Sequence, residues 1–379
     1  MTLLYQCLLL GSLSDQQVRD FSSTFSACLE VFGLQRDRDY TISCGIPADF
    51  LDTAATVAVF FGAEGARCPE ISTLLKLAVP IIPVVSCAAR VSAELPPALR
   101  SINAMLLNSA DAFTQRIVSA ALQCLGLLPV QRRVFVSYRR EESADVALQL
   151  YEALSARHFD VFLDTHSVSI AADFQAALWH RLCDSDVLIM LDTPGYFTSR
   201  WTTVEWGRAI AKHISMLQLV WPGHTPKRES HLATSKRLVE ADFNGTRLNP
   251  STIDDLALEL ERVRSVSVAL RHSSMVGTLR TAVEDLGGTV EGVGQKRSVI
   301  LKLPSGNILV VYPVVGVPTS VDLHDCIDLS DTRASAVIYD HLGISEVWSR
   351  HLEWLVSRVG TVKWLRSREV DWQLADIEV

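Results

Sequence analysis

Two short segments in the middle of the chain carry side chains that could bind and transform a small molecule. The first is an apolar run that ends in polar and basic residues: Tyr138, Arg139 and Arg140. In the second, Trp201 and Glu205 lie one turn apart on one face of an expected helix. Ligands of open α/β sheets bind at the carboxyl ends of the strands. The sequence therefore predicts a small-molecule site where the strand end faces the helix.

Strand and helix patterns alternate around these residues. Apolar runs of strand length occur at residues 134–137, 161–163, 187–191 and 216–221. Segments of helix length separate them, at residues 143–157, 173–183 and 201–213. This alternation predicts a doubly wound parallel sheet in an α/β domain over residues 132–250. The polar segment 164–171 is expected to be a loop.

The preceding residues, 1–128, show the same alternation. Short apolar runs at residues 3–10, 40–43, 57–61 and 81–85 have the pattern of buried parallel strands, with helical patterns between them. We expect a second α/β domain, either a remote duplicate of the middle domain or an unrelated flavodoxin-like fold. It lacks an equivalent of the Trp201–Glu205 pair, so we expect it to be non-catalytic or regulatory.

Residues 251–379 are expected to form a long helix followed by a small α+β domain. The helix is predicted over Thr252–Met275, and strands are predicted at residues 299–303 and 308–312. A helical spacing of large apolar side chains near the end of the chain, at Trp348, Leu352 and Leu355, favours core packing over a ligand cage. A sensor or assembly role is the expectation for this part.

The composition excludes several classes of protein. The chain has 379 residues, a formal net charge of −8 and 48% hydrophobic residues, which indicates a globular protein and gives no sign of a nucleic-acid surface. None of its eight cysteines forms a C-x-x-C pair, so we expect a reducing, cytoplasmic setting and neither a metal site nor disulfides. Residues 1–10 lack a basic leader, and the apolar runs are too short for a membrane helix.

Two other turn motifs offer weaker signals. Gly62-Ala63-Glu64-Gly65 follows an expected strand, but it lacks the third glycine of a dinucleotide-binding turn. The segment 316–320 with His324 is more consistent with a structural turn before a helix than with a nucleophile.

Four motifs of the middle domain follow one another in the order of a TIR (Toll/interleukin-1 receptor) domain, which this region resembles. They are the strand end 134–138, Phe162-Leu163-Asp164 with its polar loop, the segment 185–189, and the segment 196–205. The resemblance covers residues 133 to about 223 and extends to about 250. Trp201 and Glu205 keep an aromatic–x–x–x–glutamate pattern. The domain is therefore more similar to bacterial and axon-degeneration TIR domains that cleave NAD than to receptor adaptors.

The resemblance implies that Glu205 is catalytic and that NAD is the substrate, with no cofactor. Breaking a nicotinamide–ribose bond expels nicotinamide and leaves positive charge on the sugar, which a nearby carboxylate stabilises. The implied substrate-binding residues are Trp201, which stacks on a ring of NAD; Tyr138, which lines the cleft; Arg139 or Arg140, which hold the pyrophosphate; Ser143, which lines the same cleft; and Asp164, which opens the loop.

The same resemblance implies self-association through the TIR domain and an activating ligand or partner that the sequence does not identify. An antiviral defence role by depletion of NAD is the implied context, with ADP-ribose or a cyclic isomer as the product.

Two alternatives remain open. Thr202-Thr203-Val204-Glu205 fits a helix capping box, in which Glu205 only reaches back to the backbone. Trp201 is then a hydrophobic lid, Arg139 and Arg140 are solvated surface charges, and Asp164 is a turn residue or loop cap. In that case the domain is a non-catalytic scaffold that oligomerises through residues 164–171 and recruits a partner.

Overall fold

The computed structural model describes residues 3–52, 54–65, 68–107, 113–163, 172–227, 230, 233–330 and 333–378, without the side chains of residues 113, 172–176, 200, 201 and 378. The chain divides into two compact units. One is Met1–Val130 with Gly294–Lys296, and the other is Gln131–Val293 with Arg297–Val379. The second unit contains two five-stranded sheets, which pack on separate cores, and a small two-stranded sheet.

The first unit is built on a parallel sheet in the order β2-β1-β3-β4-β5. Its strands are β1 (Tyr5–Gly11), β2 (Tyr40–Cys44), β3 (Ala55–Phe61), β4 (Ile81–Val85) and β5 (Met105–Leu106). Its helices are α1 (Asp15–Val31), α2 (Glu70–Lys76), α3 (Val91–Glu94) and α4 (Phe113–Cys124). Ser14 caps α1 through a reciprocal capping box with Gln17.

The second unit begins with a parallel sheet in the order β10-β9-β8-β6-β7. Its strands are β6 (Arg132–Ser137), β7 (Phe159–Leu163), β8 (Val187–Asp192), β9 (Ser215–Val220) and β10 (Thr234–Arg237). The connecting helices are α5 (Arg140–Ser155), α6 (Ala172–Asp184) and α7 (Arg200–Ala211), followed by a small hairpin, β11 (Phe243–Asn244) and β12 (Arg247–Leu248). The predicted doubly wound α/β fold is confirmed.

Both sheets have the strand order 2-1-3-4-5 when each is numbered from its own first strand. This order is the flavodoxin-like form of the doubly wound fold. It fits a duplicated domain and an unrelated flavodoxin-like domain equally, so both interpretations of residues 1–128 stand.

Alternation along β6 assigns its side chains to opposite faces of the sheet. Val134 and Val136 pack in a core with residues of α5 and α8, whereas Phe135 packs with residues of α6 and α7. Ser137 therefore lies on the α6–α7 face, and Tyr138, which packs against the other core, lies on the α5 face.

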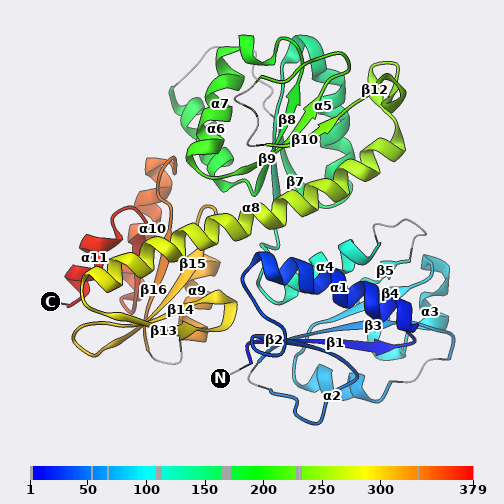
Figure 1. The fold of residues 1–379 in the computed structure, drawn as a ribbon. Helices are drawn as coiled ribbons and strands as arrows, with labels where there is room; N and C mark the ends of the chain where they lie inside the picture. Colours follow the sequence, from blue (N-terminus) through cyan, green and yellow to red (C-terminus); the bar gives the residue numbers. More distant parts are fainter. Residues whose placement is uncertain are drawn as a thin grey trace. The chain divides into compact units, whose positions relative to one another are not determined.

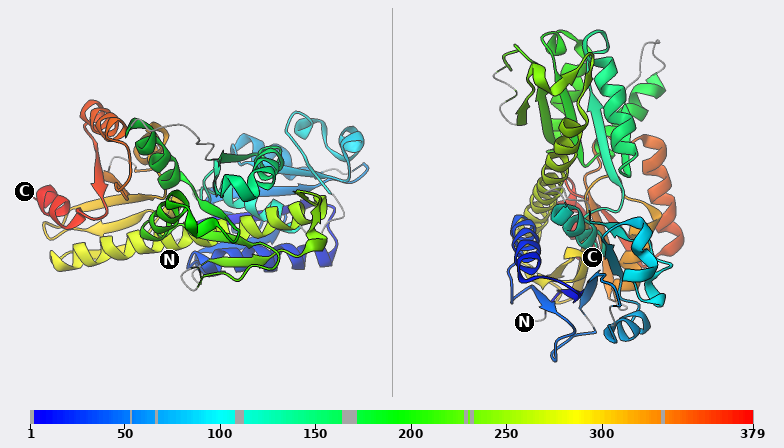
Figure 2. Two further views of the ribbon diagram at one scale, coloured as in Figure 1. Left: turned by 90° about the horizontal axis from the view of Figure 1, so that it is seen from above. Right: turned by 90° about the vertical axis from the view of Figure 1, so that its right-hand side faces the viewer.

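The helix α8 (Pro250–Asp285) is longer than the predicted Thr252–Met275. Its first half packs on the core of the middle sheet and its second half on the core of the third sheet, as Figures 1 and 2 show. Gly277, just beyond the predicted end, is a weak helix former. Packing on two cores stabilises the helix through that position.

The third sheet follows chain order, β13-β14-β15-β16-β17. Its strands are β13 (Thr289–Val293), β14 (Val299–Lys302), β15 (Ile308–Val314), β16 (Ala334–Tyr339) and β17 (Val362–Arg366), and its helices are α9 (Ser320–Leu329), α10 (Glu346–Val359) and α11 (Val370–Glu378). The first three strands are antiparallel and the last three parallel. This is the small α+β part expected from the sequence.

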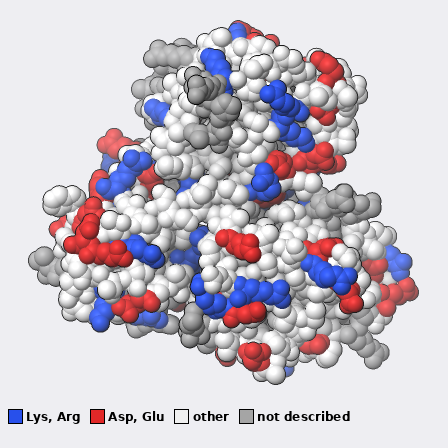
Figure 3. Space-filling model, in the orientation of Figure 1, with Lys and Arg blue, Asp and Glu red and all other residues white. Residues whose placement is uncertain are grey.

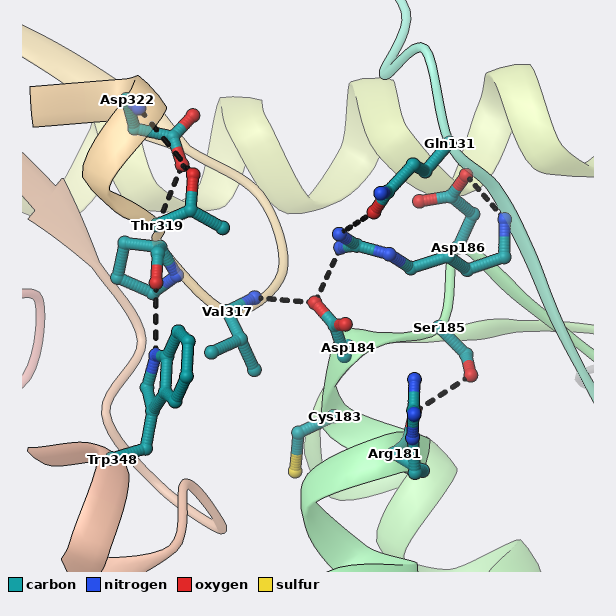
Figure 4. Close-up of polar contacts among 12 residues, drawn as sticks. Gln131, Arg181, Cys183, Asp184, Ser185, Asp186, Val317, Thr319, Asp322 and Trp348 are labelled. Carbon is teal, nitrogen blue, oxygen red and sulfur yellow. Dashed lines mark hydrogen bonds and ion pairs between the residues drawn. The ribbon is translucent and has the colours of Figure 1, made fainter. Parts of the chain in front are cut away.

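Loops of the third sheet contact the carboxyl ends of α6 and α7. The backbone N–H of Val317, before α9, donates to Asp184 Oδ1 at 3.0 Å (Figure 4). The Lys212 ammonium, just after α7, donates to the Leu342 carbonyl oxygen at 2.6 Å and pairs with Asp340 at 2.8 Å. The last part of the chain is thus attached to both helices on one face of the middle sheet.

Figure 3 shows Lys and Arg interspersed with Asp and Glu over the visible face. Among the helices that the structure describes, none is long and apolar enough to cross a bilayer.

Candidate functional site

Glu205 meets Ser137 at the carboxyl end of β6. Ser137 Oγ donates to Glu205 Oε2 at 2.5 Å, and the Tyr196 hydroxyl lies 2.7 Å from the same Ser137 oxygen. All three side chains are buried, with Glu205 only 3% exposed. They come from three different elements: β6, the short 3₁₀ turn Tyr196–Thr198, and α7. A carboxylate is therefore held beside two hydroxyl groups at the edge of the sheet where doubly wound folds bind ligands.

The helix start does not have the capping-box geometry. Helix α7 begins at Arg200 with Ser199 as its N-cap, and no side chain caps that end. Thr202, the expected cap, donates its hydroxyl back to the carbonyl oxygens of Tyr196 and Ser199. Glu205 is thus beyond the first turn, and its carboxylate contacts β6. The alternative interpretation of Glu205 as the acid of a capping box is wrong.

The electrostatics keep the neighbouring phenol neutral. Burial, and after it the Glu205 carboxylate, raise the pKa of Tyr196 well above its ordinary value. The phenol is consequently protonated at any physiological pH and supplies a hydrogen-bond donor to this group of residues. Fixed hydroxyl groups beside a buried carboxylate orient it without reorganisation during a reaction.

Sequence reasoning missed Ser137 and chose Tyr138 instead. Tyr138 is the more reactive-looking residue, but it is on the α5 face, whereas Glu205 is on the α6–α7 face. The period-two alternation of β6 contains the signal that separates them, because Ser137 shares a face with the buried Phe135. The serine is also the last residue of the strand.

Arg139 ties the loop after β6 to the loop after β8. Its guanidinium donates to Thr198 Oγ1 at 2.9 Å and pairs with Glu141 and Glu142. The Glu142 carboxylate in turn accepts a bond from the Gly195 N–H at 3.0 Å. A side chain at Gly195 would displace the ends of the Arg139 and Glu142 side chains from this arrangement. The predicted pyrophosphate-binding arginine is thus engaged with protein groups.

Arg140 and Ser143 lie apart from Glu205, in a cavity of about 480 Å³. Aromatic and proline side chains beyond α5, Trp221, Phe243 and Pro222, line the same cavity. Ser143 sits at a kink in α5, where φ is −142° and ψ is 20°, and its hydroxyl donates to the Arg139 carbonyl oxygen at 3.1 Å. The predicted binding residues therefore divide between two faces of the sheet.

Two predicted site residues lie outside the description. Asp164 is one of them, together with the loop 164–171, and the Trp201 side chain is the other. In the ranges that the structure describes, no group of three or more His, Cys, Asp or Glu side chains could hold a metal ion.

Comparison with known proteins identifies part of the chain. The model of the TIR domain family matches residues 134–257. A curated bacterial relative, the 2′ cyclic ADP-D-ribose synthase BtTIR of Bacteroides thetaiotaomicron, is 23% identical over 130 residues, which make up 34% of this chain and 45% of the relative. The chain thus spans less than half the length of this relative.

Similar solved structures include two proteins of other kinds. A putative two-component response regulator/GGDEF domain protein is 11% identical with a TM-score of 0.29, covering 68% of this chain and 99% of its own. A PurR family transcriptional regulator from Vibrio parahaemolyticus is 16% identical with a TM-score of 0.19, covering 69% of this chain and 94% of its own.

Proposed function

Because residues 134–257 are a TIR domain similar to part of a bacterial 2′ cyclic ADP-D-ribose synthase, we propose that this chain cleaves the nicotinamide–ribose bond of NAD. Glu205 is the proposed catalytic residue. The observation that carries the proposal is the placement of its carboxylate at the ligand-binding edge of a doubly wound sheet, where Ser137 donates to it at 2.5 Å.

The proposed reaction needs a carboxylate and no metal or cofactor. The bond between ribose C1′ and the pyridinium nitrogen breaks, and its electron pair leaves with neutral nicotinamide. Positive charge then develops on the ribose, where the Glu205 carboxylate stabilises it. Water that attacks C1′ gives ADP-ribose and a proton. A hydroxyl of the same molecule gives a cyclic isomer and a proton.

The burial of Glu205 implies that the site opens before it reacts. A carboxylate that is 3% exposed has little surface for a sugar to approach. We infer that self-association or an activating ligand moves α7 or the segments beside it, and so exposes the carboxylate. Trp201 and Asp164 then complete the site, Trp201 by stacking on a ring of NAD. Arg139, released from Thr198 and Glu142, becomes available to the pyrophosphate.

The flanking parts of the chain are proposed to regulate this opening. The contacts of Asp184 and Lys212 with loops of the third sheet support a restraining role for residues 286–379, because they attach to the ends of α6 and α7. Residues 1–128 are proposed to be non-catalytic. An enzyme of this kind that depletes NAD when triggered suits a defence function.

The alternative function is a TIR scaffold that assembles and recruits a partner without chemistry. The near-complete burial of Glu205 favours it, since a carboxylate buried and hydrogen-bonded can serve packing alone. The test is to mix the full chain with NAD over a wide range of protein concentration and to follow nicotinamide release. Turnover per chain that rises with concentration supports the enzyme, and no turnover at any concentration leaves the scaffold.

A further inference from the structure

A second buried carboxylate, Asp192, ends the strand next to β6. It is 0% exposed, accepts from Gln218 Nε2 at 2.6 Å, and lies 3.3 Å from His224 Nε2. Burial raises the pKa of the Asp192 carboxyl, and the bond from Gln218 opposes that shift. A buried carboxylate that holds an imidazole is the arrangement that orients a proton-accepting histidine in many enzymes.

The Gln218 amide, which donates to Asp192, is itself fixed in orientation by two serines. Ser235 donates its hydroxyl to Gln218 Oε1 at 2.6 Å, so the amide oxygen is occupied. The amide nitrogen of Gln218 donates to Ser230 at 2.9 Å as well as to Asp192. An ionised carboxylate only accepts, so we assign His224 Nε2 as the donor of this contact and Nδ1 as the acceptor of the imidazole. The His224 side chain is 14% exposed, so it reaches the surface while its partner does not.

Strand register places this pair beside the Glu205 site. Ser137 of β6 is paired with Met190 of β8, two residues before Asp192. Met190 packs on the α6–α7 face, so Asp192 lies on that same face, about 7 Å further along the strand. The Tyr196 phenol lies near both carboxylates, because the charges of Glu205 and of Asp192 both raise its pKa.

We propose that His224, oriented by Asp192, takes the proton from the hydroxyl that attacks the ribose carbon, an inference that rests on the proposed NAD cleavage. As the new bond from oxygen to C1′ forms, the attacking oxygen loses its proton to the neutral imidazole nitrogen. The imidazolium then passes that proton to water. Water and a ribose hydroxyl are equally suited as the proton donor, so His224 serves both the hydrolytic and the cyclising outcome.

Charged groups from each neighbouring element surround this pair. Asp192 on β8 contacts His224. Glu142 on α5 also interacts electrostatically with His224. The charge of Lys227, after β9, opposes the rise in the pKa of Asp192. Burial raises the pKa of Asp192, so the experiment includes a variant that removes the Asp192 carboxyl.

The test compares His224→Gln with Asp192→Asn in the full chain, with NAD as substrate and nicotinamide release as the readout across pH. Glutamine still donates to Asp192 but cannot take a proton. We expect kcat to fall about 100-fold or more in His224→Gln, and the loss of rate at acid pH to disappear. In Asp192→Asn the rate falls but its dependence on pH remains, because the imidazole that accepts the proton is still present. His213→Gln, an exposed histidine of the same domain, keeps the native profile.

A His224→Gln chain with native kcat and a native pH profile overturns the inference about His224. If Glu205→Gln is inactive in the same assay, the proposed function still stands. A native chain with no turnover at any concentration removes the proposed function and the role of His224 with it. Thermal unfolding of each variant identifies any that fails to fold. If Asp192→Asn does not fold, the result for His224→Gln alone tests the inference.

Discussion

Ser137 at the end of β6 donates its hydroxyl to the carboxylate of Glu205 on α7 at 2.5 Å, although 68 positions separate the two residues. The bond crosses from the sheet to the helix that packs on it and fixes the orientation of the carboxylate. A group that stabilises charge on a substrate is most effective when its orientation is set before the substrate arrives.

Replacing Ser137 with alanine tests that orientation. A hydrogen bond to a charged group contributes about 1.5–3 kcal/mol, so we expect kcat for NAD to fall roughly 10- to 100-fold with little change in KM. Steady-state kinetics of nicotinamide release measure both quantities. Ser274→Ala, at an exposed position of α8, is the control and should match the native chain. Unchanged kcat in Ser137→Ala would mean that the bond only serves packing.

Removing the Lys212 ammonium tests the restraint by the third sheet. The Lys212→Met variant loses its contacts with Asp340 and Leu342. Since Asp340 is partly exposed, the loss of unfolding free energy should be about 2 kcal/mol, measured by urea denaturation. If these contacts restrain α7, the variant also releases nicotinamide faster than the native chain at low protein concentration. The exposed Lys363→Met should change neither quantity, and slower turnover in Lys212→Met would show that the third sheet helps to build the site.

The contact between Gly343 and the end of α6 gives a second, steric test of the attachment of the third sheet. Gly343 has a φ of 76°, and a side chain there would overlap Cys183 Sγ at the end of α6. Gly343→Ala should therefore lower the free energy of unfolding by about 1–3 kcal/mol without removing a charge. If turnover rises in this variant as in Lys212→Met, attachment itself controls the site. Native stability in Gly343→Ala would show that α6 and the third sheet do not meet as described.

His272 on α8 makes stability depend on pH in a known direction. Burial, followed by the nearby Arg297 guanidinium, lowers the pKa of His272 to about 3, below the value of about 6.5 in an unfolded chain. Between these two values the unfolded chain binds a proton that the folded chain does not. Protonation of His272 therefore costs the folded chain no stability above about pH 6.5. As the pH falls from there towards 3, the free energy of unfolding decreases by up to roughly 1.4 kcal/mol per pH unit.

Denaturant unfolding at several pH values checks this expectation. His272→Leu should lose less stability than the native chain between pH 6.5 and pH 4, whereas His324→Leu, which replaces an exposed histidine, should follow the native curve. Parallel curves for the native chain and His272→Leu would contradict the assignment.

Local patterns in the sequence predicted the strands and helices of the middle domain and its doubly wound fold. The same patterns did not predict the length of α8, because packing on two separate cores outweighs the weak helix preference of Gly277. The order of motifs predicted the TIR domain, and the family match over residues 134–257 confirms it.

The site was harder to predict than the fold. Chemistry alone favoured Tyr138, whereas alternation along β6 places Ser137 on the face of Glu205. Asp192 and His224 are 32 positions apart, and only the pairing of β8 with β9 brings their surroundings together. The burial of Glu205 depends on Tyr196 and on the turn before α7, which local sequence patterns do not reveal.

The most direct test of the central claim is NAD turnover by Glu205→Gln in the full chain, at the highest protein concentration and with any trigger that activates the native protein. Products are separated by chromatography so that nicotinamide, ADP-ribose and cyclic isomers are all counted. We predict that the native chain releases nicotinamide, that Glu205→Gln releases none above background while folding and assembling normally, and that Glu284→Gln, at an exposed position of α8, behaves as the native chain. Native turnover in Glu205→Gln would contradict the account.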